Sequence, residues 1–214
     1  MDQSRLAPAD FVLYRDYHDT EWGQPLRDSA ALFERISLEA FQSGLSWLII
    51  LRKRENFRRA FHGFDVDRIA RYTKRDIDRL MADTGIVRNR AKVEATIANA
   101  RAAADLDVDL SELLWSFAPP LRPRPADLSQ VPAVTPESTA MAKELKRRGF
   151  RFVGPTTAYA LMQATGMVDD HVADCWVPPA GRSVGGTPHA SGGPTRPKGR
   201  GTRLGDESGD RAPS

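Results

Sequence analysis

A repeated helical pattern covers most of this 214-residue sequence and limits its possible folds more than any other feature. Between residues 26 and 176, apolar residues recur at helical spacing, and most of the runs end at a glycine or a proline. The alternation of apolar and polar residues that marks a β-strand is almost absent, and no internal repeat is visible. The runs begin at or near Ser29, Ser46, Asp65, Thr73, Arg88, Asp109 and Thr135. This pattern predicts an all-α fold.

Local signals predict where several of these helices begin and end. Thr73-Lys-Arg-Asp76 resembles a capping box, and Thr135-Pro136 offers an N-cap followed by proline at the first helical position. Ser29 is the expected cap of a helix that Gly44 interrupts. The proline-rich stretch 119–136 predicts a surface connection between two helical lobes.

Composition narrows the class of protein. Apolar residues make up 41% of the chain and charged residues 28%, which is typical of globular proteins, and no apolar run approaches the roughly 18 residues of a membrane span. The first residues, Met1-Asp-Gln-Ser-Arg-Leu, lack the apolar core of a secretion signal. Cys175 is the only cysteine, so the chain cannot form an internal disulfide and suits a reducing compartment. We therefore expect a cytoplasmic protein that does not contact membranes.

The C-terminal tail differs in composition from the rest of the chain. Residues 181–214 hold nine of the sixteen glycines, four of the fifteen prolines and no aromatic residue, so they cannot bury enough apolar surface to fold. Their six Lys or Arg against three Asp or Glu account for the whole net charge of +3, so any basic surface elsewhere must come from local clustering. We predict a domain at residues 1–178 and a disordered basic tail at 179–214, which is either a flexible tether or an extension without function.

Residues 143–166 predict two helices joined by a short turn. The first helix ends at Gly149, a short apolar link follows, and Gly154 begins the second helix. The free N–H groups at the start of the second helix suit a phosphate, because the helix dipole is positive there. The basic residues that cluster beside the turn are Lys143, Lys146, Arg147, Arg148 and Arg151. The segment is therefore either a DNA-binding hairpin or an ordinary helical corner with a solvated charged face.

A carboxylate interrupts the apolar face of the first predicted helix. Glu39 follows Ile36 by three residues, so it lies on the face that packs inward. A buried carboxylate needs a partner, which is either structural or part of a functional site. Tyr14, Tyr17 and Trp47 lie nearby in sequence. These rings belong either to the core or, together with the acid, to a pocket for a flat cationic ring.

One pair of residues has the spacing of metal ligands. His171 and Cys175 are four positions apart and would share one face of a helix. Imidazole nitrogen and thiolate sulfur are both good zinc ligands, but a zinc site needs further ligands. By chemistry alone, His18 and His62 are equal candidates, so a zinc site is one of two interpretations of a weak signal.

Six segments stand out in order along the chain. They are Tyr17-His-Asp-Thr-Glu-Trp-Gly23, Leu38-Glu-Ala-Phe-Gln-Ser-Gly-Leu-Ser-Trp47, Lys53-Arg-Glu-Asn-Phe57, Gly85-Ile-Val-Arg-Asn-Arg90, Lys146-Arg-Arg-Gly-Phe-Arg-Phe-Val-Gly154 and Asp170-His-Val-Ala-Asp-Cys175. Together they resemble the successive motifs of the DNA-3-methyladenine glycosylase I family, over roughly residues 10–178.

The resemblance implies an all-α helix-hairpin-helix DNA glycosylase with residues 149–154 as the hairpin. Such an enzyme removes 3-methyladenine from alkylated double-stranded DNA by hydrolysing the N-glycosidic bond, after it has flipped the damaged nucleotide out of the duplex. Lys146, Arg148, Arg151 and Gly154 would then contact DNA. We expect a monomer that is associated with the nucleoid through DNA.

The resemblance also implies roles for the residues of the pocket. Glu39 would read the methylated adenine and take part in catalysis, Trp47 would stack on the base, and Tyr14 and Tyr17 would form walls. Asp169 stands where related helix-hairpin-helix glycosylases carry a catalytic aspartate, although the 3-methyladenine family usually has no acid there. Asp169 is therefore either an additional catalytic carboxylate or a helix cap.

The family carries a structural zinc, which corresponds here to His18, His171 and Cys175. Its fourth ligand belongs to a Cys-Gly-Trp segment that also supplies a pocket tryptophan, and the aligned stretch here is Arg5-Leu-Ala7. We therefore predict a zinc site with three protein ligands that holds the metal weakly, and a pocket that lacks one wall. Because of this departure, a competing function is an inactive hairpin module that only binds DNA. A third interpretation is a glycosidase of free nucleosides or sugars.

Overall fold

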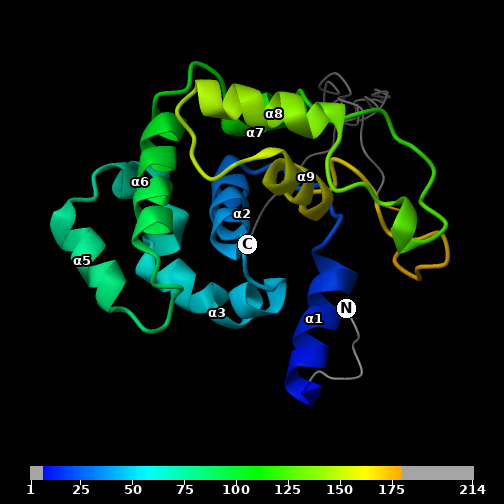
Figure 1. Cartoon of the computed structure of the whole chain (residues 1–214), viewed down its shortest axis with the longest axis horizontal. Helices are drawn as coiled ribbons and strands as arrows, with labels where there is room; N and C mark the ends of the chain where they lie inside the picture. The colour runs from blue at the N-terminus through cyan, green and yellow to red at the C-terminus, as the bar shows by residue number, and fades with distance from the viewer. Residues whose placement is uncertain (1–6, 180–214) are drawn as a thin grey trace, which may run out of the picture. The chain divides into compact units, whose positions relative to one another are not determined.

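The computed structural model describes residues 7–179, and all regular structure in that range is helical (Figure 1). The α-helices are α1 (Pro8–Thr20), α2 (Ser29–Gln42), α3 (Trp47–Ala60), α4 (Val66–Ala70), α5 (Lys74–Ala82), α6 (Arg90–Ala104), α7 (Leu110–Trp115), α8 (Pro136–Arg147) and α9 (Pro155–Ala164). Two short 3-10 helices, η2 (His62–Phe64) and η3 (Leu128–Gln130), lie in the connections. The predicted all-α class is confirmed.

Side-chain caps fix several helix ends. The capping box predicted at Thr73 forms, and so does the N-cap predicted at Thr135, which forms a second capping box with Ser138. The cap of α2 is Asp28 rather than Ser29, because the Asp28 carboxylate accepts a hydrogen bond from a first-turn backbone N–H at 2.8 Å. The Ser29 hydroxyl instead donates to Asp109, the cap of α7, at 2.7 Å. One serine thus ties the beginnings of two helices together.

Helix α2 packs against four other α-helices and so lies at the centre of the core. It packs against α3, α6, α7 and α9, and Figure 1 shows α6 and α9 on either side of it. Helix α4 packs along α6, and α8 packs along α9, so two groups of helices share one continuous hydrophobic core. Its fully buried phenylalanines are Phe33, Phe41, Phe57, Phe61 and Phe64. Burying this apolar surface is the main favourable contribution to folding.

Helix α1 is the element that the sequence pattern does not predict. Tyr17 is its only buried residue, so α1 lacks the wide apolar stripe that reveals an amphipathic helix. It packs on α3, where Asp10 forms an ion pair with Arg52. Because α1 carries Tyr14, Tyr17 and His18, its position determines the geometry of the site.

The proline-rich connection between α7 and α8 runs over the surface, as predicted, and leaves Leu121 and Leu128 exposed. The tail predicted at 179–214 lies outside the described residues, apart from residue 179, and so does Arg5. Between residues 7 and 179, no helix combines the length and the apolar character that a membrane span requires.

Candidate active site

A pocket of about 450 Å³ brings the candidate residues together. This volume is typical of small-molecule sites. Its wall includes all four residues predicted to bind a base, Tyr14, Tyr17, Glu39 and Trp47, and all three predicted metal ligands, His18, His171 and Cys175. These residues come from α1, α2, α3 and the loop after α9. Two groups that the sequence indicates separately therefore share one cavity.

Glu39 lies on the inner face of α2, as its spacing predicts. Its side chain is only 5% exposed, and none of the described residues donates a hydrogen bond to its carboxylate. Burial raises the pKa of Glu39 from 4.5 to about 7, and the positive charge of Arg35 opposes this rise. Such a carboxylate lacks a close partner, and a ligand in the pocket can supply one.

Trp47 and Tyr17 form an aromatic corner in the same pocket. Their ring centres are 5.4 Å apart. The Arg35 guanidinium lies 5.3 Å from the centre of the Tyr17 ring and 5.4 Å from that of Trp47, so it attracts both π-systems. The Trp47 Nε1–H is buried and has no acceptor. The corner therefore offers two aromatic ring surfaces and one hydrogen-bond donor to a bound ligand.

Sequence reasoning missed Arg35, which holds this corner in place. Its guanidinium donates to the Tyr17 hydroxyl at 2.9 Å and lies 3.6 Å from Glu21. Glu21 in turn accepts two hydrogen bonds from Arg54, at 2.5 and 2.8 Å. The detectable signal was that Arg35 precedes Glu39 by one helical turn, so the apolar face of α2 carries two opposite charges.

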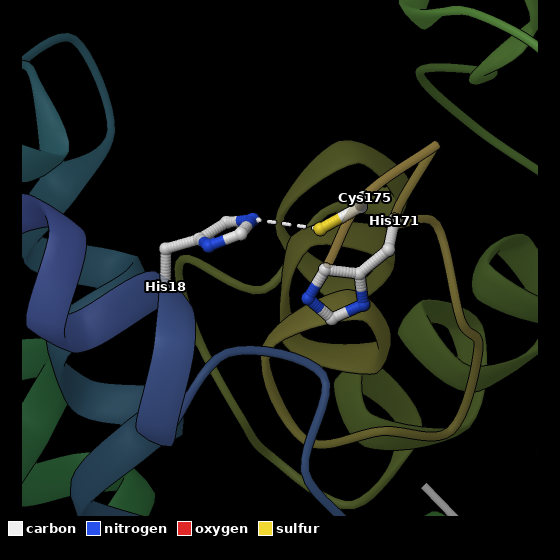
Figure 2. Close-up of side chains that lie close together, drawn as sticks. All are labelled: His18, His171 and Cys175. Carbon is white, nitrogen blue, oxygen red and sulfur yellow. Dashed lines mark hydrogen bonds between the residues drawn. The ribbon is translucent and has the colours of Figure 1, made fainter. Parts of the chain in front are cut away.

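The three predicted metal ligands lie close together in the pocket wall. Figure 2 shows their side chains pointing toward one another, with His18 on one segment and His171 and Cys175 on another. The three ligand atoms lie within 4.8 Å of one another, and His18 Nε2 is 3.7 Å from Cys175 Sγ. Tetrahedral zinc with ordinary bond lengths would separate nitrogen and sulfur by about 3.5 Å. His62 lies elsewhere and pairs with Tyr72, so His18 completes the cluster.

The helical interpretation of the spacing between His171 and Cys175 is wrong. This segment forms turns, and the Cys175 N–H donates to the Val172 carbonyl at 2.9 Å in one of them. The turn nevertheless brings both side chains to the same place.

Carboxylates orient both imidazole rings. His18 Nδ1 lies 2.8 Å from Asp19 Oδ1, and His171 Nδ1 lies 2.8 Å from Asp169 Oδ1. Each contact leaves Nε2 as the free ligand atom. Nε2 of His171 is buried without a partner, and burial lowers the pKa of this ring against the opposing effect of Asp169. Neutral imidazole nitrogen and thiolate sulfur are the donors that zinc requires, and these side chains can supply both, so the cluster fits zinc.

Asp169 contacts His171, one of the predicted metal ligands, and is not part of the pocket wall. Burial raises its pKa, but hydrogen bonds from Arg124, at 2.9 Å, and from His171 outweigh burial and hold the pKa of Asp169 below its ordinary value. No helix follows Asp169 in the described range, which removes the helix-cap interpretation. The geometry makes Asp169 an orienting partner of His171.

Two glycines allow the connection between α1 and α2 to contact the loop after α9. Gly23 and Gly166 have φ values of 77° and 69°, a region that favours glycine. A Cβ on Gly166 would lie 2.7 Å from the Gly23 carbonyl oxygen, and one on Gly23 would lie 2.6 Å from the His171 ring. This close approach brings α1, and with it His18, to His171.

The hairpin forms where the sequence predicts it. Gly149 follows α8 with a φ of 95°, and Gly154 is the N-cap of α9. A Cβ on Gly154 would have no atom within 4 Å. The backbone at the start of α9 is therefore open to a phosphate.

Asn99 holds the hairpin in place, and the sequence analysis did not identify it. This buried residue of α6 accepts a hydrogen bond from the Arg151 N–H at 2.7 Å and donates one to the Arg151 carbonyl at 3.1 Å. The contact joins positions 52 residues apart, so no local pattern indicates it.

The basic residues predicted to contact DNA fall into two groups. Lys146 and Arg151 are exposed and form no ion pair within residues 7–179. Arg148 is paired with Asp107 at 2.5 Å and Glu144 at 2.6 Å, and its side chain is only 18% exposed. Arg148 therefore braces α8 against the segment that follows α6, and Lys146 and Arg151 remain available to phosphates.

Comparison with known proteins identifies the family to which this chain belongs. The sequence profile described as Methyladenine glycosylase matches residues 9–178. The chain belongs to the methyladenine glycosylase family. Among relatives in this family, DNA-3-methyladenine glycosylase of Haemophilus influenzae is 49% identical over 168 residues, covering 76% of this chain and 91% of that protein. DNA-3-methyladenine glycosylase 1 of Escherichia coli is 46% identical over 168 residues, covering 76% and 90%.

Solved structures of the methyladenine glycosylase family share the fold. A crystal structure of 3-methyladenine DNA glycosylase I has a TM-score of 0.75 at 48% identity and covers 77% of this chain and 93% of its own. A Staphylococcus aureus enzyme, studied for its recognition of 3-methyladenine, has a TM-score of 0.75 at 39% identity and covers 77% and 90%. The predicted helix-hairpin-helix glycosylase class is confirmed.

Proposed function

We propose that this chain is a DNA-3-methyladenine glycosylase that releases 3-methyladenine from alkylated duplex DNA in base excision repair. The two relatives named above carry this activity in their names. The observation that carries the proposal is the Glu39 carboxylate, buried without a hydrogen-bond partner in the same pocket as the Trp47–Tyr17 corner. We also propose that the enzyme acts as a cytoplasmic monomer on the DNA of the nucleoid.

The departure of the methylated base needs little acid catalysis. 3-Methyladenine is cationic while it is attached to deoxyribose, so the bond between C1′ and N9 breaks with its electron pair moving to the base, which leaves neutral. Water then adds to the oxocarbenium-like C1′ and loses a proton to solvent. The protein must therefore extrude the base, select it and admit water.

We assign base selection to the pocket. The ionised Glu39 carboxylate attracts a cationic base and accepts a hydrogen bond from its edge, while normal adenine is neutral and gains less. Trp47 and Tyr17 give the ring a surface for stacking, with Tyr14 as a further wall. Arg35 and Asp169 are positioning residues, because each contacts a residue of the site and neither lines the cavity.

We assign duplex binding to the hairpin. The open backbone around Gly154 suits one phosphate, and the unpaired charges of Lys146 and Arg151 add attraction that depends on salt. Asn99 holds this backbone in shape through its two bonds to Arg151.

We further propose a structural zinc on His18, His171 and Cys175. Such a metal would tie α1 to the loop after α9 and so stabilise two walls of the pocket. Thiolate and neutral imidazole are needed for binding, so the metal should be lost as the pH falls toward about 5. Cys175→Ser should lower stability more than excision, and elemental analysis of the purified chain gives the zinc content.

A base-release assay on methylated duplex DNA, with the product identified by chromatography, tests the function. The glycosylase proposal expects free 3-methyladenine. Duplex binding without release would instead identify an inactive DNA-binding module. Release from free nucleosides together with an absence of salt-sensitive duplex binding would identify a small-molecule glycosidase.

A further inference from the structure

We propose that Leu128 packs against the deoxyribose of the extruded nucleotide, at the point where the base pocket opens to solvent. This inference rests on the glycosylase function proposed above, and it adds a residue that contacts the sugar and not the base. Leu128 belongs to η3, in the connection between α7 and α8, and so lies in a different part of the chain from Glu39 and Trp47.

The position of Leu128 in the pocket is the first observation. Leu128 lines the same cavity as Glu39 and Trp47, yet it is 72% exposed. Among the residues between 7 and 179 that form this wall, all others are buried or half-buried. A single exposed leucine is ordinary on a protein surface, but this one borders a ligand cavity. Leu128 therefore lies at the opening of the pocket, where an entering nucleotide would cover it.

The segment that carries Leu128 is fixed to the loop after α9, which is the second observation. The Arg122 guanidinium donates to the buried carboxylate of Asp170 at 2.7 Å, and the Pro125 carbonyl accepts a hydrogen bond from the Ala173 N–H at 2.9 Å. Figure 1 shows the two segments beside each other, in green and orange. The opening of the pocket is thus built before a ligand arrives.

Local hydrogen bonds also hold the short helix η3 in shape. The Asp127 carboxylate accepts a hydrogen bond from the Ser129 N–H at 2.8 Å, and the Gln130 side-chain oxygen accepts one from the Ala126 N–H at 3.0 Å. A backbone that is already ordered loses less conformational entropy when a ligand binds, so an apolar contact made from it contributes more to affinity.

The chemistry of the substrate decides which of its parts reaches Leu128. Glu39 is 5% exposed and Trp47 is 8% exposed, so a base that contacts them lies inside the pocket. The deoxyribose joins this base to the phosphates of the duplex outside, so it lies at the opening. Its C2′ methylene and ring carbons offer apolar surface, whereas phosphates take cationic and hydrogen-bonding partners. A leucine at the opening therefore suits the sugar.

Base release from methylated duplex DNA by the Leu128→Ala variant, measured as kcat/KM, tests this contact. We expect a fall of about fivefold, because alanine is too short to cover the sugar. Leu128→Met keeps an apolar side chain of similar length and should release the base at close to the wild-type rate. Leu121→Ala is the matched control, because Leu121 is 62% exposed in the same connection and does not line the cavity. Its kcat/KM should equal that of the wild type.

Two binding measurements separate a sugar contact from a structural role of Leu128. Free 3-methyladenine carries no sugar, and the nucleotides of an undamaged duplex remain stacked. The Leu128→Ala variant should therefore bind both with wild-type affinity, whereas a distorted pocket or connection would weaken them together with base release.

Three results would overturn the inference and leave the proposed function standing. They are an unchanged kcat/KM in Leu128→Ala, an equal loss of affinity for the free base, which would place Leu128 against the base, and an equal loss in Leu121→Ala, which would mean that the whole connection contacts DNA. A wild-type chain that releases no base would refute the proposed function itself, and the inference with it.

Discussion

Replacing Glu39 by glutamine should change stability and excision in opposite directions. The substitution preserves shape and removes a charge that is 5% exposed and receives no hydrogen bond from the described residues. If the carboxylate is kept for a cationic ligand, the free protein is destabilised by holding it, and the variant should unfold less readily at high pH while it excises the base more slowly.

The pKa of Glu39 sets the size of the stability effect. Its ordinary pKa is 4.5, and burial raises it to about 7 in the folded protein. Between these values the folded state holds a proton that the unfolded state has lost, so the free energy of unfolding falls as the pH rises. At about 1.4 kcal/mol for each pKa unit, Glu39→Gln should gain up to about 3 kcal/mol at pH 8 and little at pH 4.

Urea unfolding at pH 5 and pH 8, with single-turnover release of 3-methyladenine, measures both effects. We expect excision to fall at least about tenfold, or about 1.4 kcal/mol of transition-state stabilisation. Glu94→Gln is the matched control, because Glu94 is exposed on α6 and the loss of its charge should change the free energy of unfolding much less. If the Glu39→Gln variant excised the base at the wild-type rate, Glu39 would not belong to the site. If the variant and the wild type had the same free energy of unfolding at pH 8, the Glu39 charge would not be desolvated.

Three further predictions follow from other parts of the structure. In the wild type, kcat/KM for base release should rise as the pH increases through about 7, because Glu39 must be ionised; a profile that is flat from pH 6 to 8 would contradict this role. Lys146→Ala and Arg151→Ala should weaken duplex binding at all sequences and reduce the salt slope by about one each, whereas Arg148→Ala, whose charge is already paired, should leave the slope unchanged in fluorescence anisotropy. Gly166→Ala should lower the free energy of unfolding by at least about 2 kcal/mol, because its Cβ would meet backbone atoms at 2.7 Å; calorimetry showing an unchanged Tm would refute the close packing of the two segments.

The helices with strong local signals were predictable, and α1 was not. Capping boxes at Thr73 and Thr135 depend on residues three positions apart, so the sequence contains the whole signal. Helix α1 buries only Tyr17 and is stabilised by packing on α3 and by the ion pair of Asp10 with Arg52. Those contacts are distant in sequence, and a local pattern cannot report them.

The same distinction separates the site residues that were found from those that were missed. Glu39 could be found because its spacing along the helix places it on the apolar face that packs into the protein interior. The partners that orient the site, such as Arg35 against Tyr17 and Asn99 against Arg151, act across 18 and 52 residues. The spacing of His171 and Cys175 predicted that their side chains meet, but a turn and not a helix brings them together.

The indole resonance of Trp47 tests most directly whether this pocket binds the methylated base. The chain has four tryptophans, and ¹⁵N labelling with Trp47→Phe for assignment resolves the Trp47 Nε1–H, which is buried without an acceptor in the free protein. Trp115 is the internal control, because its Nε1–H donates to the Leu26 carbonyl at 2.8 Å outside the pocket wall. Titration with free 3-methyladenine should shift the Trp47 resonance saturably and leave that of Trp115 in place. A Trp47 resonance that does not move while the base binds would show that recognition takes place elsewhere.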